Sequence, residues 1–262
     1  MTQGSLKIVT LPQLTMGQDW RLALAHDRAE SVMIWITRGQ GRLLLEGQRR
    51  GVGTHNAIVI PARHLFALDL GRQTVAQVVV VPEASDLPFP RRPAQLRIRD
   101  ADAMTELTVL MEAATREQQK ARPLLQSAME AHGALISVWL QRQMALEEHL
   151  PPAANAAVRL SNAYSKRITA HFQEPLTMAD HAAALGVTPT HLTRACKAAT
   201  GKTAADLLTE RILYEARHLL VATNAPAQDI ARFLGFGSAA YFTRFIQHHT
   251  NATPSKLRKQ AA

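Results

Sequence analysis

The chain has 262 residues, of which 47% are hydrophobic and 19% are charged, and such proportions are typical of a globular protein with room for two domains. No apolar run approaches 18 residues, and the first residues lack the basic and apolar segments of a secretion signal, so we expect a cytoplasmic protein without membrane contact. The single cysteine, Cys196, excludes an internal disulfide and fits a reducing compartment.

The net charge of +9 is unevenly distributed along the chain. Residues 1–152 contain 17 Lys and Arg against 15 Asp and Glu, whereas residues 153–262 contain 13 against 6, a net charge of +7. A basic segment attracts the phosphate backbone of DNA because binding releases condensed counterions. The C-terminal charge therefore favours a nucleic-acid partner, although many basic domains bind no nucleic acid.

Residues 1–100 are predicted to form an antiparallel sandwich or barrel, because short apolar segments alternate with turns rich in Gly and Pro. The segment Pro82–Pro93 breaks both the helical and the strand periodicity, so it is predicted to be an extended linker that leaves this domain. The expected strands are Trp20–Ala25, Val32–Thr37, Arg42–Glu46, Ala57–Ile60, Leu65–Leu70 and Val75–Val81.

Amphipathic helices are predicted at Asp102–Gln119 and Pro123–Glu148. Their apolar residues can pack on the preceding domain alone, or they can also form an interface with a partner, and the pattern leaves both readings open. Pro151 and Pro152 then interrupt the chain, and a further helix at Ala154–His171 is expected to open the C-terminal domain.

The segment Pro226–Arg258 has the pattern of a helix, a tight turn and a second helix. Ile230, Phe233 and Leu234 fall at i, i+3 and i+4 on an apolar face that is expected to pack on a neighbour. Gly235 can end this helix because glycine adopts positive φ at little cost. Ser238 is suitably placed to cap the second helix, which together with the turn gives a helix-turn-helix signature. The predicted apolar face of the second helix contains Tyr241, Phe242, Phe245 and Ile246.

An earlier segment, Ala183–Thr203, repeats this pattern. The pair Leu185-Gly186 matches Leu234-Gly235 at an offset of 49, and one extra residue in the second turn changes the offset to 50 for Thr188 with Ser238 and for Leu192-Thr193-Arg194 with Phe242-Thr243-Arg244. Agreement at so many positions predicts two helix-turn-helix units in tandem. An intervening helix at Ala204–Ala222 can hold them apart so that they enter consecutive major grooves, about 34 Å apart on one face of DNA.

The repeat, which closes with IARFLGFGSAAYFTRFIQHHTNATPSKLRK, resembles the DNA-binding domain of the AraC/XylS transcription regulators over roughly the last hundred residues. The resemblance implies a DNA-binding regulator without cofactor or catalytic activity, whose partners are double-stranded DNA and, if it activates, RNA polymerase. Two departures from the family pattern are visible. Asn251 replaces a preferred Gly, although Asn tolerates the left-handed conformation. Ile212 replaces an Arg of the linker helix, so a family-typical salt bridge is in doubt.

Two N-terminal segments, RGQGRLLLEGQRR and THNAIVIPARHLFALDL, resemble the cupin-like sensor barrel that commonly precedes this domain. This weaker resemblance implies a small-molecule effector in the barrel and a homodimer built on the helices that follow. No metal is expected, since His residues spaced as metal ligands are missing from residues 1–100. Residues that can line a barrel mouth are Trp35, His55 and His64, although surface or internally satisfied histidines are the simpler reading.

The expected fold is therefore an α+β protein of two domains: a cupin-like antiparallel barrel with a proline-rich exit at residues 1–100, a helical linker and dimerisation region at 101–150, and an all-α tandem helix-turn-helix domain at 153–262. We expect a transcription regulator controlled by a small molecule. The alternatives are a regulator whose barrel serves only as a dimer scaffold, and a cupin enzyme with an appended helical domain.

A recognition helix reads base edges through side chains near its N-terminal half. Arg194 and Arg244 can each pair with guanine, although contact with phosphate is the alternative. Ala240 offers only a methyl group, so the second unit is expected to read sequence less sharply. The expected DNA-contacting residues are Thr188, Thr190, Thr193, Arg194 and Lys197 in the first unit and Ser238, Ala240, Tyr241, Thr243, Arg244, Lys256 and Arg258 in the second.

Overall fold

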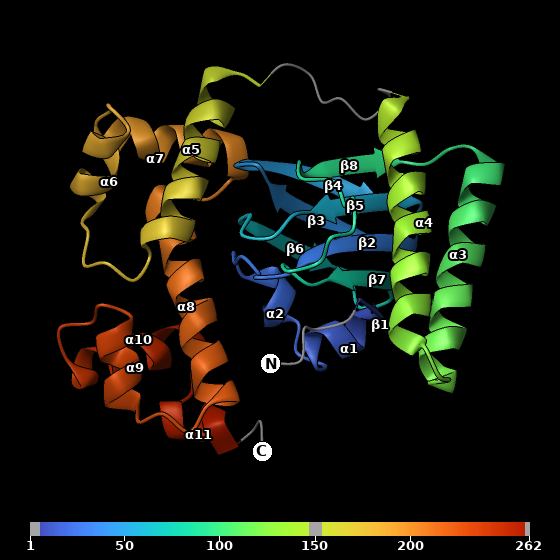
Figure 1. Cartoon of the computed structure of the whole chain (residues 1–262). Helices are drawn as coiled ribbons and strands as arrows, with labels where there is room; N and C mark the ends of the chain where they lie inside the picture. The colour runs from blue at the N-terminus through green and yellow to red at the C-terminus, as the bar shows by residue number, and fades with distance from the viewer. Residues whose placement is uncertain (1–5, 147–153, 260–262) are drawn as a thin grey trace. The chain divides into compact units, whose positions relative to one another are not determined.

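The computed structural model describes residues 6–146 and 154–259 (Figure 1). The chain divides into two compact units, Met1–Asp19 with Asp27–Leu45 and Arg50–Ala153, and Trp20–His26 with Glu46–Arg49 and Ala154–Ala262. The elements up to residue 146 are β1 (Lys7–Thr10), α1 (Leu11–Thr15), α2 (Trp20–Ala23), β2 (Ser31–Arg38), β3 (Gln40–Leu45), β4 (Gln48–Gly53), β5 (Asn56–Ile60), β6 (Phe66–Leu70), β7 (Val75–Val81), β8 (Ala94–Arg97), α3 (Ala101–Lys120) and α4 (Leu125–Ala145). Those that follow are α5 (Ala156–His171), α6 (Met178–Ala184), α7 (Pro189–Thr200), α8 (Ala204–Ala222), α9 (Ala227–Phe233), α10 (Ala239–Thr250) and α11 (Pro254–Lys259).

The strands form two antiparallel sheets, with the orders β1-β7-β2-β5-β8 and β4-β3-β6. Strand β2 is central to the larger sheet, where Ile34 lies opposite both Ile58 and Val78. Among the described residues each sheet keeps two edge strands, so the hydrogen bonds form two open sheets rather than the predicted closed barrel. Periodicity identifies strands but not their partners, and closure depends on which strands pair.

Both faces of the five-stranded sheet are buried. On one face, Met33, Trp35 and Val59 join a core with side chains of α3 and α4, and these two helices lie side by side in Figure 1. Trp139 of α4 is fully buried there and its indole N–H donates to the carbonyl of Ala103 at 3.0 Å. The side chains on the other face of this sheet are also buried: Val32, Ile34, Ile36, Ile58 and Ile60. In the smaller sheet the buried side chains include Leu43, Leu45, Phe66 and Leu68. Large apolar side chains therefore fill the interior of this unit.

Five of the six predicted strands are confirmed, with small shifts in bounds, as β2, β3, β5, β6 and β7. The prediction of a strand at Trp20–Ala25 is wrong, because this segment forms the short helix α2. Its letters WRLALA satisfy both the two-residue and the three- to four-residue apolar spacing, and such short segments are decided by packing. Strands β1, β4 and β8 were not predicted from the sequence, because β1 and β8 have only four residues each and β4, QRRGVG, contains a single large apolar residue, Val52.

The segment Pro82–Pro93 contains no strand or helix, as predicted, but it does not leave the domain. After it, β8 pairs with β5 so that Gln95 lies opposite Ile58, and the chain thus returns to the sheet. Proline has no amide hydrogen for a sheet ladder and therefore marks the loop clearly, whereas the following strand of four residues leaves no comparable signal.

Helices α3 and α4 confirm the two predicted helices. Asp100 caps α3, since its Oδ2 accepts a hydrogen bond of 2.8 Å from the amide of Ala103. The predicted end of the second helix at Glu148 and the interruption at Pro151 and Pro152 lie outside the described residues. No helix in the described ranges is both long and apolar enough to span a bilayer.

Candidate nucleic-acid interface

Two helix-turn-helix units, α6–α7 and α9–α10, are built by the same local chemistry. The turns are entered through Gly186 at φ +68° and Gly235 at φ +74°, a left-handed conformation that favours glycine. The hydroxyl of Thr188 then accepts from the amide of His191 at 3.2 Å, and that of Ser238 accepts from the amide of Tyr241 at 3.1 Å. Both caps and both turns confirm the sequence prediction.

The recognition helices α7 and α10 have 12 residues each, begin 50 positions apart and end in the same way. The hydroxyl of Thr200 donates to the carbonyl of Cys196 at 2.8 Å, and that of Thr250 donates to Ile246 at 2.7 Å. The next residues, Gly201 and Asn251, both adopt a left-handed conformation, with φ values of 78° and 53°. Asn251 therefore replaces glycine without loss of the turn, as predicted.

Helix α8 joins the two units, and its 19 residues correspond to about 28 Å at 1.5 Å per residue. In Figure 1 it runs from the α6–α7 unit to the α9–α10 unit. Arg211 is buried in this helix, pairs with Glu215 at 2.8 Å, and places its guanidinium 3.7 Å from the ring centre of Phe172. The linker helix therefore contains an ion pair, and its cation is Arg211, the residue before Ile212.

Five exposed positions of α7 recur in α10 at an offset of 50, whereas Pro189 and His249 are exposed in one helix only. This regular spacing places one continuous solvent-facing stripe on each recognition helix, opposite the side that packs into the core. A stripe of this kind is the part of a recognition helix that can approach base edges. Its members are Thr190, His191, Arg194, Lys197 and Ala198 on α7 and Ala240, Tyr241, Arg244, Gln247 and His248 on α10.

The aromatic ring of Tyr241 lies on this stripe and not on the apolar face where the sequence placed it. It is 57% exposed, whereas Phe242 and Ile246 are fully buried and Phe236 packs edge-on against Phe242. Phe236 therefore occupies space near the core that the simple spacing assigned to Tyr241. His191, which the offset of 50 aligns with Tyr241, also lies on this stripe although it was not predicted there. Phe233, predicted on the packed apolar face of α9, is 51% exposed, so this prediction is wrong.

The remaining predicted residues occupy other positions. Thr188 and Ser238 are helix caps whose hydroxyl oxygens accept hydrogen bonds from backbone amides. Thr193 and Thr243 are half-buried beside the exposed stripe. Lys256 is exposed on α11. The guanidinium of Arg258 donates to the carbonyls of Leu220, near the end of α8, and of Ala225, in the segment that follows it.

Two titratable groups of the first helix-turn-helix unit belong to its core rather than to the exposed stripe. Cys196 is fully buried, and burial raises the pKa of its thiol to about 11, as expected for a structural cysteine. His181 is 1% exposed and packs edge-on against the ring of Tyr164, and burial lowers its pKa. Both side chains therefore favour their neutral forms.

Of the three residues predicted to line a barrel mouth, Trp35 and His55 lie together, whereas His64 lies apart from them. Trp35 is buried in β2 and stacks on His55 with ring centres 6.0 Å apart. His55 directly precedes β5, and Trp35 lies opposite Ala57 of that strand. His64 follows β5 at its other end, and its Nδ1 lies 3.0 Å from the carbonyl of Ala62. Within residues 6–146 and 154–259, no three His, Cys, Asp or Glu side chains gather to hold a metal ion.

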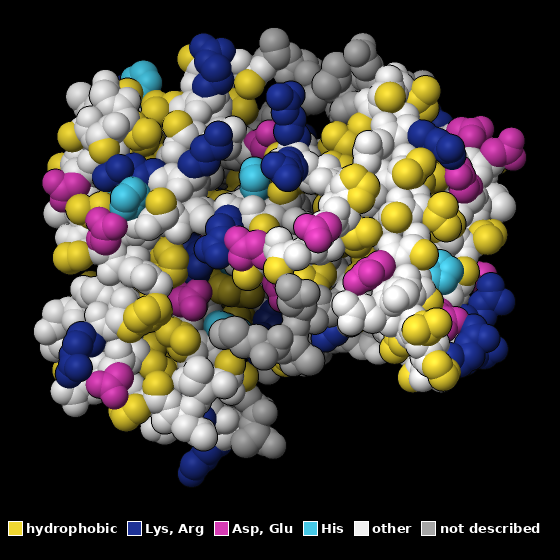
Figure 2. Space-filling view, viewed as in Figure 1, with side chains coloured by type: hydrophobic (Ala, Val, Ile, Leu, Met, Phe, Trp, Pro, Cys, Tyr) yellow, Lys and Arg dark blue, Asp and Glu magenta, His cyan; other side chains and the backbone are white. Residues whose placement is uncertain are grey.

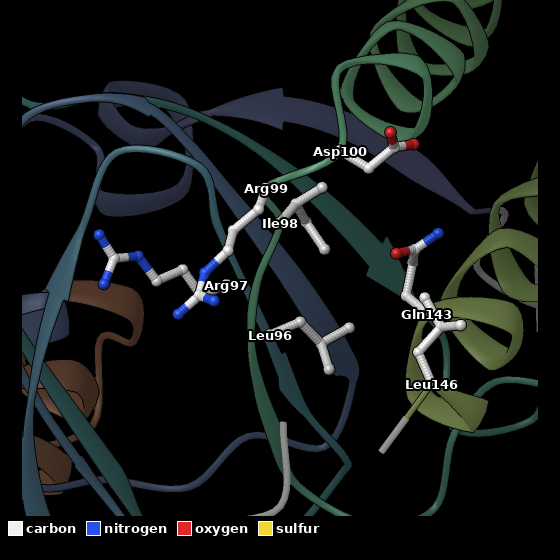
Figure 3. A pocket seen from close by; sticks show the side chains of 7 residues that line it. All are labelled: Leu96, Arg97, Ile98, Arg99, Asp100, Gln143 and Leu146. Atoms are coloured by element: carbon white, nitrogen blue, oxygen red, sulfur yellow. The ribbon is translucent and has the colours of Figure 1, made fainter. Parts of the chain in front are cut away.

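A pocket of about 340 Å³ lies elsewhere in this unit, between β8 and the end of α4. Figure 3 shows Leu96 and Ile98 on the side of Gln143, whereas the side chains of Arg97 and Arg99 extend away from it. The wall facing α4 is therefore mainly apolar, with the amide of Gln143 as a polar group.

Comparison with known proteins gives matches that centre on the tandem repeat. A family described as a helix-turn-helix domain matches residues 181–260. The probable transcription factor PqrA of Proteus vulgaris is 38% identical over 74 residues, which cover 28% of this chain and 61% of PqrA. The chain thus spans less than two thirds of that relative.

Solved structures give two kinds of match. A transcriptional regulator with an AraC-type DNA-binding domain from Chromobacterium violaceum is 31% identical and covers 38% of this chain and 88% of its own, with a TM-score of 0.35. ToxT from Vibrio cholerae O395 covers 98% of both chains at 11% identity, with a TM-score of 0.44.

Proposed function

The chain belongs to the AraC/XylS family of transcription regulators through its tandem helix-turn-helix domain, and we propose that α7 and α10 read DNA in two consecutive major grooves. The observation that carries this proposal is the pair of matching exposed stripes, each with an arginine at the same helical position, Arg194 and Arg244. The length of α8 supports it, because about 28 Å is close to the spacing of adjacent grooves, about 34 Å.

Selection of genomic fragments with the purified full chain at two salt concentrations tests this proposal. We expect a discrete motif with two half-elements about one helical turn apart, retained at the higher salt concentration because base contacts add to the phosphate term. Binding that is strongly salt-dependent but enriches no motif would contradict sequence reading and leave only electrostatic attachment to phosphate.

We further propose that the N-terminal unit binds a small-molecule effector that controls the regulator. The cupin-like strand pattern supports it, and the apolar pocket beside Gln143 offers the kind of surface that small ligands use. The alternative, a unit that serves only as a dimer scaffold, is favoured by the dense packing of its interior.

We also propose that the chain forms a homodimer through α4, because this helix carries an apolar stripe that the rest of the N-terminal unit does not cover. Leu124, Ala128, Ala131, Leu135 and Val138 alternate at four and three residues, which is the seam spacing of paired helices. None of them is buried, and Leu124 is 80% exposed. Two small residues, Ala128 and Ala131, lie between Leu124 and Leu135 along the seam, so a second copy of α4 can pack its leucines against these alanines.

Substitution of Leu135 with arginine is expected to convert the dimer to a monomer, because a charge would be placed in the middle of the seam. Sedimentation at micromolar concentration measures the effect. The matched control is Val109→Arg on α3, since Val109 is 54% exposed and Leu135 is 53% exposed. A monomeric parent chain, or a dimer unaffected by Leu135→Arg, would contradict the proposed seam.

A further inference from the structure

The end of the α3–α4 hairpin carries a cavity of about 300 Å³ with an unusual concentration of positive charge. Figure 2 shows basic side chains and a histidine gathered at this end of the hairpin. The charged residues that line the cavity are Arg116, Glu117 and Lys120 of α3, Arg122 of the turn and His132 of α4. With a neutral histidine, these groups carry a net charge of +2.

The charges converge because of helical spacing. Ala113, Arg116, Glu117 and Lys120 follow each other at three, one and three residues, so they share one face of α3, and α4 packs beside this helix. The alanine at the start of this row leaves room between the longer side chains. The cavity is thus built by two packed helices together with the turn that joins them.

The acidic residue does not neutralise the cluster. Glu117 pairs with Arg122, which still has further N–H groups to donate. Among the described residues, Lys120 and Arg116 form no ion pair, and the Nε of Arg116 donates only weakly to the carbonyl of Glu112 at 3.4 Å. Two cationic side chains therefore remain available to a ligand. The negative end of the α3 dipole, about half a charge, offsets only part of this excess.

The imidazole of His132 lines the cavity on the side of α4. Its Nδ1 atom is buried and has no hydrogen-bond partner among the described residues, which is costly for a polar atom. Close by, Ala121 and Leu124 adopt φ values of 43° and 64°, so the turn that carries Arg122 is held in a strained conformation.

We propose that this cavity binds the phosphoryl group of a small phosphate monoester. A monoester is largely dianionic at neutral pH and matches the net charge of +2, and its oxygens can accept from Arg116, Lys120 and Arg122 together. The site is separate from the recognition helices and does not depend on the proposed reading of DNA.

Calorimetric titration of the full chain with inorganic phosphate, at constant ionic strength in chloride buffer, tests the proposal. We expect saturable binding that the double variant Arg116→Gln, Lys120→Gln weakens at least tenfold. The control variant Arg91→Gln, Arg92→Gln removes the same charge from exposed positions outside this cavity and should bind as the parent does. Glycerol phosphate should bind, whereas dimethyl phosphate and acetate, which carry one charge, should bind at least tenfold more weakly.

The substitution Glu117→Gln is expected to change phosphate affinity in the opposite direction. Removing the acid raises the charge of the cavity, so phosphate should bind several-fold more tightly, which a purely structural role of these residues would not produce. Circular dichroism shows whether each variant is folded, and Lys120→Arg should restore binding if Lys120→Gln loses it. Absence of saturable binding by the parent chain, or equal weakening by the control variant, overturns the assignment.

Discussion

Replacement of Arg194 with alanine is expected to lower affinity for the selected DNA site by about one to two orders of magnitude and to abolish the preference at one base pair. An arginine that pairs bidentately with guanine contributes about 1–3 kcal/mol of discrimination. The side chain is exposed on the stripe of α7, next to His191 and Lys197, so its removal leaves the helix core intact. Binding of a library randomised at each position measures both effects.

Matched substitutions separate base reading from phosphate contact. Arg244→Ala should have the same kind of effect at a base pair in the other half-element, and a smaller one if the second unit reads less sharply, as Ala240 suggests. Lys256→Ala should weaken binding to all sequences alike and reduce the salt dependence by about one counterion. If Arg194→Ala lowers affinity uniformly and leaves the preference profile unchanged, Arg194 contacts phosphate and base reading at this position is refuted.

Replacement of Gly235 with alanine is expected to destabilise the C-terminal unit by about 3 kcal/mol. The left-handed conformation costs an L-residue about 1–2 kcal/mol, and crowding adds about 1–3 kcal/mol. A Cβ atom at this position would lie 2.6 Å from the backbone oxygen of Gln173, which cannot rotate away as a side chain can. Urea unfolding followed by circular dichroism measures the loss.

The repeat supplies the control for this prediction. Gly186 has nearly the same φ, yet a Cβ atom there would meet nothing within 4 Å. Gly186→Ala should therefore cost only the conformational penalty, about 1 kcal/mol. Equal losses in the two variants would show that contact with Gln173 does not contribute, and that the turn geometry alone determines the cost.

The C-terminal unit was largely predictable because its signals are local. Hydroxyl caps at Thr188 and Ser238, the turn glycines and apolar spacing each act within a few residues, and the repeat presents them twice. The bounds of α8 coincide with those predicted, Ala204–Ala222. Local chemistry of this kind is visible in the sequence, because the atoms that interact are close along the chain.

The N-terminal unit was less predictable because its decisive contacts join distant residues. Strand β8 is identified as a strand by its pairing with β5, almost 40 residues earlier, and β1 by its pairing with β7. The order of the strands, and hence two open sheets instead of a barrel, follows from such pairings. Periodicity alone contains no information about which strand lies beside which.

For the interface, the sequence by itself determined the recognition helices and the arginines at matching positions. Only the tertiary structure decided which other side chains remain exposed: Phe242 and Ile246 are buried while Tyr241 is 57% exposed, and Arg258 donates to the carbonyls of Leu220 and Ala225. Burial depends on neighbours brought by the fold from other segments. Spacing along a helix therefore predicts a face, whereas packing determines which residues on that face remain free to bind.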